Sequence, residues 1–334
     1  MNNRLSFYAI LFLTIIFYGC NPNPLDVNIK DEKLPIKYIN VDQQLYGQPL
    51  DKLKSNVQSF KEQLGDLFIY ELSQNIRQQI NDTSYHAIFS FYNSDYISEI
   101  EESKNNLYAK LPAHQDKMNT AFNYLSFHFS DSILPKNIFY INKLFSQVAC
   151  TNTNIAIGLE NYLPPESDVI SSIPNEKLYQ WQRARMNIEF LERDVLLNWI
   201  QVQLFDELDG KLAEHIIQAG KILYVLNATF PKSDEAYILR YNEEQYKWAR
   251  ENERSVWNYL VRQQLLFKTD LRVRTNFLNE GPSTIGLDEK SPDRIGQFLG
   301  YRIVKGYMSK NKALSLQELL EKKYNIILQT YEIQ

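Results

Sequence analysis

The chain has 334 residues, of which 44% are hydrophobic and 23% are charged, and its formal net charge is -4. This hydrophobic content, with only 11 Gly and 12 Pro, excludes an intrinsically disordered protein. The near balance of charge, without a basic patch, argues against a nucleic-acid partner. The 22 Tyr and 18 Phe provide large aromatic surfaces for either a packed interior or an interface.

Residues 1–19 have the pattern of a bacterial signal peptide. Met1–Arg4 carries one positive charge, and Leu5–Tyr18 is a weakly polar to apolar run. A helix that spans a bilayer needs roughly 20 apolar residues, so this run suits a cleaved signal better than a permanent span. Gly19 and Cys20 follow it, and a small residue before a cysteine at this place is the lipobox pattern. We therefore predict lipid attachment at Cys20; the alternative is an uncleaved signal anchor.

The remainder divides into a tether and a domain. Residues 20–35 are rich in proline, asparagine and charge, and this composition predicts a lipidated N-terminus with a flexible tether. Residues 36–334 are expected to form a single, mainly helical globular domain, held at the membrane in the periplasm. If Cys20 carries lipid, Cys150 has no disulfide partner, and we expect it to be a buried, inert thiol.

A few short segments predict strands. Ile36–Val41 alternates apolar and polar residues, which is typical of a half-buried strand or a docked extended segment. Two β-like runs, Ile138–Ile141 and Phe145–Cys150, precede the turn residues Thr151–Asn154, and Ile155–Leu159 returns as an apolar run. The fold class is therefore mainly α with a small β-hairpin or sheet.

Apolar residues at spacings of three and four predict most of the remaining chain to be helical. The expected helices are Leu50–Leu64, Leu67–Ile80 after an interruption at Gly65, one holding Ala87 and Phe91, Tyr96–Leu111 ended by Pro112, Gln115–Phe129, Lys211–Asn227, a long helix opened by Ser233–Glu235 with Ala249, Val256 and Leu260 inside, Ile295–Met308, and Leu314–Tyr324. Thr269–Asp288 is expected to be a loop.

The helix over 295–308 carries two glycines four residues apart. Glycine costs about 1 kcal/mol relative to alanine inside a helix, so Gly296 and Gly300 need a reason. Close approach of a neighbouring backbone supplies one, and the helix Lys211–Asn227 is the expected neighbour. The alternative is an exposed groove that receives a partner peptide.

No catalytic motif is evident. The histidines are His86, His114, His128 and His215, and no two are three or four apart, so the His-Glu-x-x-His pattern of zinc proteases is missing. Nucleophile elbows, phosphate-binding loops and calcium loops are missing too. Three acidic or acid-histidine pairs are expected to lie on solvated helix faces: Glu101-Glu102, Asp206-Glu207 and Glu214-His215. We expect a non-enzymatic protein without a metal or cofactor; the alternative is an envelope hydrolase, peptidase-like, with an unrecognised site.

Two segments carry a more specific resemblance. Cys150–Leu163 reads CTNTNIAIGLENYL, and Ile295–Tyr307 reads IGQFLGYRIVKGY. Together with the lipobox they resemble the gliding-motility lipoprotein GldB family of the Bacteroidetes, over essentially the whole mature chain. One departure is Pro164-Pro165, where a glycine is expected after Leu163. The resemblance implies an envelope protein needed for gliding, with partners among the gliding and type IX secretion proteins.

The order of elements is also similar to a family described as zinc-dependent proteases. In that family the first helix of a pair carries His-Glu-x-x-His and the second a glutamate ligand. Here Leu197–Gln203 has no histidine, and only Glu214 stands in a ligand-like place. This similarity implies a degenerate zincin-like scaffold that lost its metal, whose old substrate cleft could grip a peptide or a partner protein.

Overall fold

A computed structural model describes residues 25–332 except 31, 82 and 145. The predicted signal peptide and Cys20 lie outside these residues.

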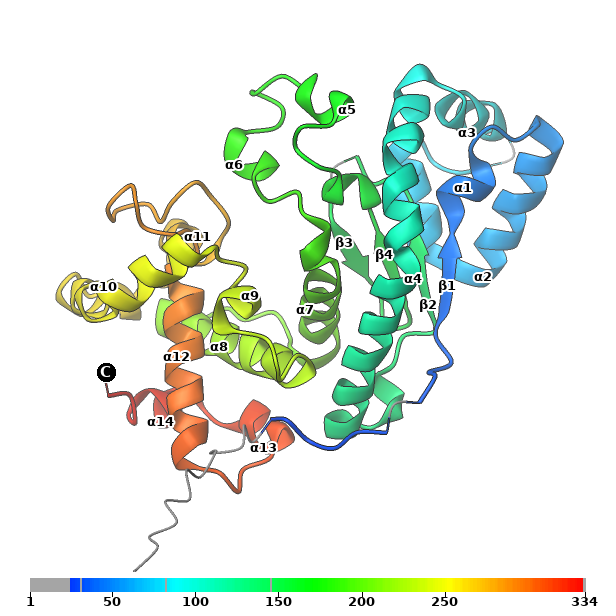
Figure 1. The fold of residues 1–334 in the computed structure, drawn as a ribbon. Coiled ribbons are helices and arrows are strands. Elements are labelled where there is room, and N and C mark those ends of the chain that lie inside the picture. The colour runs from blue at the N-terminus through cyan, green and yellow to red at the C-terminus, as the bar shows by residue number, and fades with distance from the viewer. Residues whose placement is uncertain (1–24, 31, 82, 145, 333–334) are drawn as a thin grey trace, which may run out of the picture.

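A mixed sheet of four strands organises the first half of the chain. The strands β1 (Lys37–Asn40), β2 (Asn137–Tyr140) and β4 (Asn154–Ile157) are parallel, and β3 (Val148–Cys150) runs antiparallel to β4. Their order is β1-β2-β4-β3, so β3 forms one edge of the sheet (Figure 1). The predicted hairpin is confirmed as β3–β4. The parallel pairing of β1 with β2 requires a long crossover, which the helices between them provide.

Both faces of the sheet are buried, and the two-residue period of the strands assigns side chains to each face. Ile138 and Tyr140 point into the larger hydrophobic cluster, whereas Phe139 and Ile141 point into a smaller one. The smaller cluster is completed by α1 (Val41–Leu45), α2 (Leu50–Ile76) and α3 (Tyr85–Tyr92). The larger one is covered by α4 (Asp95–Phe129), α7 (Leu191–Leu204) and α8 (Leu212–Thr229). The mainly helical class with a small sheet is confirmed.

Two expected helix breaks have different outcomes. Gly65 interrupts α2 as predicted, with a positive φ of 62° that glycine adopts without steric cost. The prediction that Pro112 ends a helix is wrong, because α4 continues through it to Phe129. Proline removes one helical hydrogen bond, but the buried stripe that includes Leu111 and Met118 runs on past it, and packing of this stripe holds the helix together.

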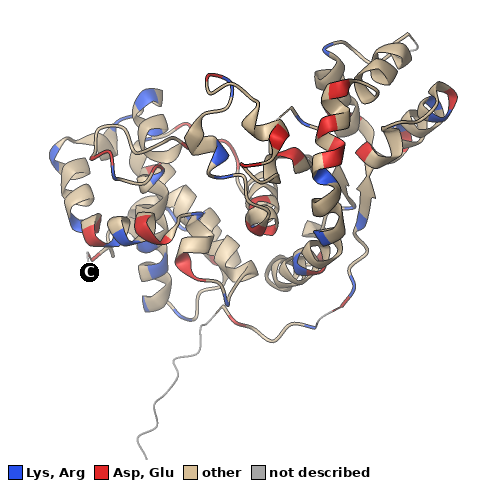
Figure 2. Ribbon diagram, turned by 45° about the horizontal axis from the view of Figure 1, so that its top comes forward, with Lys and Arg blue, Asp and Glu red and all other residues tan. Residues whose placement is uncertain are grey.

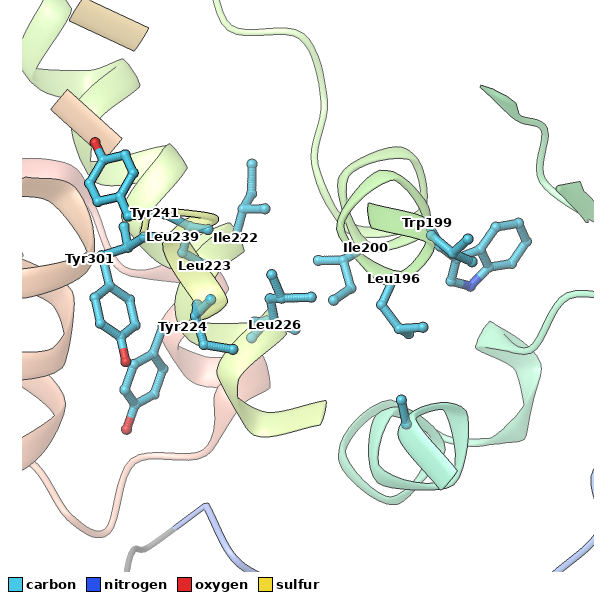
Figure 3. Packing of buried hydrophobic residues seen from close by; sticks show 14 of the residues in the cluster. Leu196, Trp199, Ile200, Ile222, Leu223, Tyr224, Leu226, Leu239, Tyr241 and Tyr301 are labelled. Atoms are coloured by element: carbon cyan, nitrogen blue, oxygen red, sulfur yellow. The ribbon is translucent and has the colours of Figure 1, made fainter. Parts of the chain in front are cut away.

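The predicted packing of α12 (Ile295–Lys310) against α8 is confirmed at Gly300, which meets Gly220 of α8, whereas Gly296 lies against Phe277 and Leu278 instead of α8. A Cβ atom added to Gly300 would collide with the carbonyl oxygen of Ile216, and one added to Gly220 would collide with that of Gly300. The alternative of an exposed groove is therefore wrong, since Gly296 and Gly300 are both buried. Around the crossing, Ile200 of α7 lies on the side of Leu226 of α8, and Tyr301 of α12 lies beside Tyr224 (Figure 3).

Three helix boundaries in the second half differ from the prediction. The long helix after Asp234 is divided into α9 (Glu235–Leu239) and α10 (Glu243–Arg262), because Arg240 adopts a left-handed conformation with φ of 56°. The expected loop contains α11 (Leu271–Leu278), whose first turn is capped by the Asp270 carboxylate. The last expected helix is two short ones.

The remaining short elements connect these units. They are α5 (Asp168–Ser171), α6 (Gln180–Arg183), α13 (Leu316–Glu321), α14 (Tyr324–Leu328) and the 3-10 turns η1 (Asp131–Ile133), η2 (Leu159–Tyr162), η3 (Ile188–Phe190) and η4 (Leu265–Phe267).

The described part of the predicted tether lies along the domain. Its positions before β1 form no helix or strand, in line with their composition. However, Leu25 is buried in the larger cluster, and the amide of Asn123 on α4 donates a hydrogen bond of 2.8 Å to the carbonyl of Glu32. The segment therefore packs on the domain instead of standing apart from it.

Candidate functional site: a cleft beside the free edge of the sheet

The edge strand β3 presents unpaired backbone groups. The N–H of Gly158 donates to Gln147 and that of Thr151 to Asn154, while Ala149 is paired with Ala156. In an antiparallel pair, residues that face the partner strand alternate with residues that face away from it. Val148 and Cys150 therefore direct their N–H and C=O groups to the free edge, where no strand of the described chain pairs with them. Such an edge can accept an extended peptide as a further strand.

A cavity of about 320 Å³ opens beside this edge. We call it the edge cleft. It is lined by Gln147, Val148, Asn161, Leu178, Trp181, Gln182, Arg185, Met186, Asn198 and Glu280. These residues come from the start of β3, from η2, from the α6 region, from α7 and from the segment after α11. Most of the lining is polar, so the cleft suits a ligand that makes hydrogen bonds in addition to apolar contacts.

The edge cleft borders a set of charges, most of them buried, that we call the arginine network. It consists of Arg185, Arg193, Arg240 and Arg294 with Asp194, Asp293 and Glu280. Four cations therefore meet three anions. Elsewhere acidic and basic residues are interspersed over the ribbon, without a large face of one sign in this view (Figure 2).

The deep half of the network is centred on Asp194 of α7. Its carboxylate pairs with Arg193 at 2.9 Å and Arg240 at 3.0 Å, and it accepts a hydrogen bond from the Tyr162 hydroxyl. Burial lowers the pKa of Arg193 to about 10. The pairing of Arg240 with Asp194 explains why the chain breaks between α9 and α10: the left-handed turn at Arg240 accompanies a buried ion pair that local sequence does not reveal.

The shallow half of the network reaches the cleft. Asp293 pairs with Arg185 and with Arg294, and its carboxylate also accepts from the N–H of Gly281. Arg185 makes a second ion pair, of 3.0 Å, with Glu280. Burial raises the pKa of Glu280, but Arg294 and the other arginines outweigh this and bring it below its ordinary value. Glu280 is therefore ionised at neutral pH.

A second buried polar cluster lies at the carboxyl ends of the parallel strands. Asp42 follows β1, Lys143 follows β2 and Glu160 follows β4. The Lys104 ammonium, fully buried on α4, pairs with Asp42 at 2.7 Å and with Glu101 at 2.5 Å. Burial raises the pKa of Glu160 to about 7. These groups are buried, and their ion pairs join the strand ends to α4.

This second cluster corrects one prediction. Glu102 is exposed as expected, but Glu101 is buried and bonded to Lys104 and to the Tyr108 hydroxyl. A signal was present in the sequence, because Lys104 occupies a place in the apolar stripe Ile97, Ile100, Leu107 and Leu111. A lone lysine on such a stripe needs a buried acid, and Glu101 lies one helical turn away from it.

The other acids and the histidines do not converge on one place. Asp206 and Glu207 are exposed, and Glu214 is half-buried beside Gly210. The four histidines lie apart on different helices: His86 on α3, His114 and His128 at separate places on α4, and His215 on α8. Among the described residues, no three His, Cys, Asp or Glu side chains are grouped so that they could hold a metal ion.

Two histidines have charged neighbours of their own. The ring of His114 shares a hydrogen bond of 2.7 Å with Glu192 of α7, and His215 contacts Arg274 at 2.8 Å. Burial, together with Arg274, lowers the pKa of His215. Cys150 is half-buried on β3, and burial keeps its thiol protonated by raising its pKa to about 12.

The two segments that carried the family resemblance supply much of the polar interior. In the first, Asn161 lines the edge cleft, and its neighbours Glu160 and Tyr162 reach the two buried clusters. In the second, Tyr301 donates to Asn227 of α8, and Arg302 and Lys305 pair with Glu253 and Glu235. Arg185 and Glu280 were not foreseen; nothing in their local sequence distinguishes them from surface charges.

The site and the fold together define a mainly helical protein in which the edge strand β3 of a small mixed sheet lies beside a charged cleft. The family model for gliding motility protein GldB matches residues 22–332. The chain therefore belongs to the GldB family of gliding motility proteins. No curated protein and no solved structure shows significant similarity to it. No helix in the described part of the chain is both long and apolar enough to cross a membrane.

Proposed function

We propose that this gliding motility protein is a lipid-anchored, non-enzymatic component of the envelope machinery shared by gliding and type IX secretion. The lipid is on Cys20, the domain is in the periplasm, and the edge cleft binds an extended segment of a partner protein. The observation that carries the last part is the free edge of β3 directly beside the cavity. Backbone groups of Val148 and Cys150 supply affinity there, and the cleft supplies selectivity.

The experiment replaces Val148 by proline. The N–H of Val148 faces the free edge, so its loss removes no bond between β3 and β4 but blocks strand addition. We expect Val148→Pro to reach normal levels in the envelope and to melt like the parent domain, yet to fail to restore gliding in a deletion strain. Val148→Thr keeps the N–H and the β-branched shape, and it should restore gliding. Normal gliding with Val148→Pro would contradict the proposal.

The non-enzymatic part has its own test. A protease of the zinc type must hold one ion per chain, and the helix pair expected to do so retains only Glu214. We expect elemental analysis of the purified chain to find no stoichiometric zinc. One zinc per chain retained through dialysis would overturn this part of the proposal.

A further inference from the structure

We propose that the peptide bound in the edge cleft carries a carboxylate, which replaces the carboxylate of Glu280 on Arg185. This inference rests on the proposed peptide-binding function and names the ligand chemistry. While the cleft is empty, the carboxylate of Glu280 occupies the place on Arg185 that the ligand carboxylate takes when the peptide binds.

The first support is the imbalance of the arginine network. Asp194 and Asp293 are almost fully buried and cannot be exchanged for a ligand. They leave two of the four guanidinium charges uncompensated, and Glu280 neutralises only one of these. An anion that enters the cleft is therefore attracted by a fixed positive charge in a region of low dielectric constant.

The second support is the position of Arg185. Of the four arginines, it is the one that lines the edge cleft, and its side chain is 13% exposed. Its guanidinium lies 5.4 Å from the centroid of the Trp181 ring and is held from behind by Asp293. Because Nη2 is engaged by Asp293, the Nη1 group that contacts Glu280 is the donor that a ligand carboxylate can take over.

The third support is the contrast between the two acids that share Arg185. Asp293 is buried, and it is also bonded to Arg294 and to the N–H of Gly281. Glu280 is 45% exposed and lies outside any helix, in the segment between α11 and α12. Glu280 is therefore the partner of Arg185 that can turn into solvent. When a ligand carboxylate takes its place, the guanidinium of Arg185 keeps an anionic partner.

The edge strand places the ligand carboxylate. Val148 and Arg185 line the same cavity, so a strand added to β3 passes beside the guanidinium. Alternate side chains of that strand point to the same face, and one of them, or the chain terminus, lies in the cavity. A cationic side chain would instead add charge to a network that is already positive, and it would compete with Arg185 for Glu280.

The test uses four peptides of the sequence Thr-Val-Thr-Val, each with a fluorophore on its N-terminal amine, and the purified chain lacking residues 1–20. One peptide ends in a free carboxylate and one in an amide; the other two are amidated and carry Glu or Lys in place of the second Thr. Fluorescence anisotropy gives the dissociation constants for the parent chain and for Glu280→Gln. The free-acid and Glu peptides separate a terminal from a side-chain carboxylate.

At least one carboxylate peptide should bind roughly tenfold more tightly than the neutral amide. Glu280→Gln should lower the dissociation constant of that carboxylate peptide further, because the neutral glutamine side chain does not compete with the ligand for Arg185. The dissociation constant of the peptide that ends in an amide should not change. Arg185→Gln should abolish the preference; if that variant fails to fold, the sign of the Glu280→Gln effect still decides. Tighter binding of the Lys peptide, or equal binding of acid and amide, overturns the inference while peptide binding stands. If none of the four peptides binds, the inference is also overturned. The gliding phenotype of Val148→Pro then decides separately whether the proposed function fails as well.

Discussion

Asp42 shows how much one buried side chain can organise. Its carboxylate accepts hydrogen bonds from the Lys104 ammonium at 2.7 Å, the Tyr92 hydroxyl at 3.2 Å and the backbone N–H of Asn142 at 2.9 Å. Lys104 belongs to α4 and Tyr92 to α3, and Asn142 follows the end of β2 by two residues. The end of β1 is thereby fixed to three parts of the chain.

We expect Asp42→Ala to lower the free energy of unfolding by about 3–5 kcal/mol, because it leaves Lys104 buried with less compensation. Glu102→Ala on the exposed side of α4 is the matched control and should change it by less than about 0.5 kcal/mol. Urea denaturation of both variants measures the difference. Similar midpoints for the two would show that the buried pair contributes little.

Glu160 makes stability depend on pH. Burial raises its pKa from the ordinary value of 4.5 to about 7, so between these values the folded chain binds a proton that the unfolded chain has released. The unfolding free energy contributed by this group is therefore present at low pH and is lost as the pH rises through about 7. Glu160→Gln keeps an oxygen for the N–H of Lys143, and it should flatten this fall. Urea midpoints from pH 5 to 8 test it; an equally steep fall in the variant would assign the pH dependence to other groups.

For single residues, the sequence predicted which side chains are exposed better than it predicted which side chains pair with one another. The solvated character of Asp206, Glu207 and Glu102 could be predicted, since exposure follows from local composition. The pairing of Arg185 with Glu280 and Asp293 joins positions about a hundred residues apart, and no local pattern encodes it.

Among the helices, the crossing of α8 and α12 offers the sharpest test of the structure. Gly300→Leu should destabilise the chain by roughly 1–3 kcal/mol or more, because its side chain would enter the backbone of α8 near Ile216. Gly306→Ala on the same helix meets nothing within 4 Å, and it should be neutral or stabilise by up to about 1 kcal/mol. The melting temperature of Gly300→Leu should lie below that of the parent chain, and that of Gly306→Ala should equal or exceed it. A Gly300→Leu chain that melts like the parent refutes the packing.

Pro112 provides a second test on a helix. It is exposed within α4, where it forfeits a hydrogen bond that any other residue would make. Pro112→Ala should therefore stabilise the chain, by up to about 3 kcal/mol. A lower urea midpoint in this variant would mean that the proline fits a bend on which the packing of α4 depends.

Elements set by local signals were predictable, whereas those set by distant contacts were not. The β3–β4 hairpin follows from the turn residues 151–154, and the glycines of α12 pointed to a close neighbour. The division between α9 and α10 depends on the buried pair of Arg240 and Asp194. The α11 helix had a capping signal in Asp270 that the prediction did not use.

For the molecule as a whole, the anchor is the first property to establish. Cys20→Ala should prevent lipid attachment and cleavage, so that the chain accumulates as a precursor with its first 19 residues. Mass spectrometry of the N-terminal peptide distinguishes the two forms. A mature chain that begins anywhere other than an acylated Cys20 would contradict the proposal.

The burial of Leu25 has a geometric consequence for such an anchor. A fully extended chain reaches at most about 3.6 Å per residue, so the five steps from Cys20 to Leu25 span no more than about 18 Å. An acylated Cys20 would therefore lie within about 18 Å of the buried Leu25, and so short a connection would give the domain a preferred orientation at the membrane. In Figure 1, α6, which borders the edge cleft, lies at the opposite end of the molecule from this N-terminal segment. The edge cleft would then face away from the side of the domain that the anchor holds at the membrane.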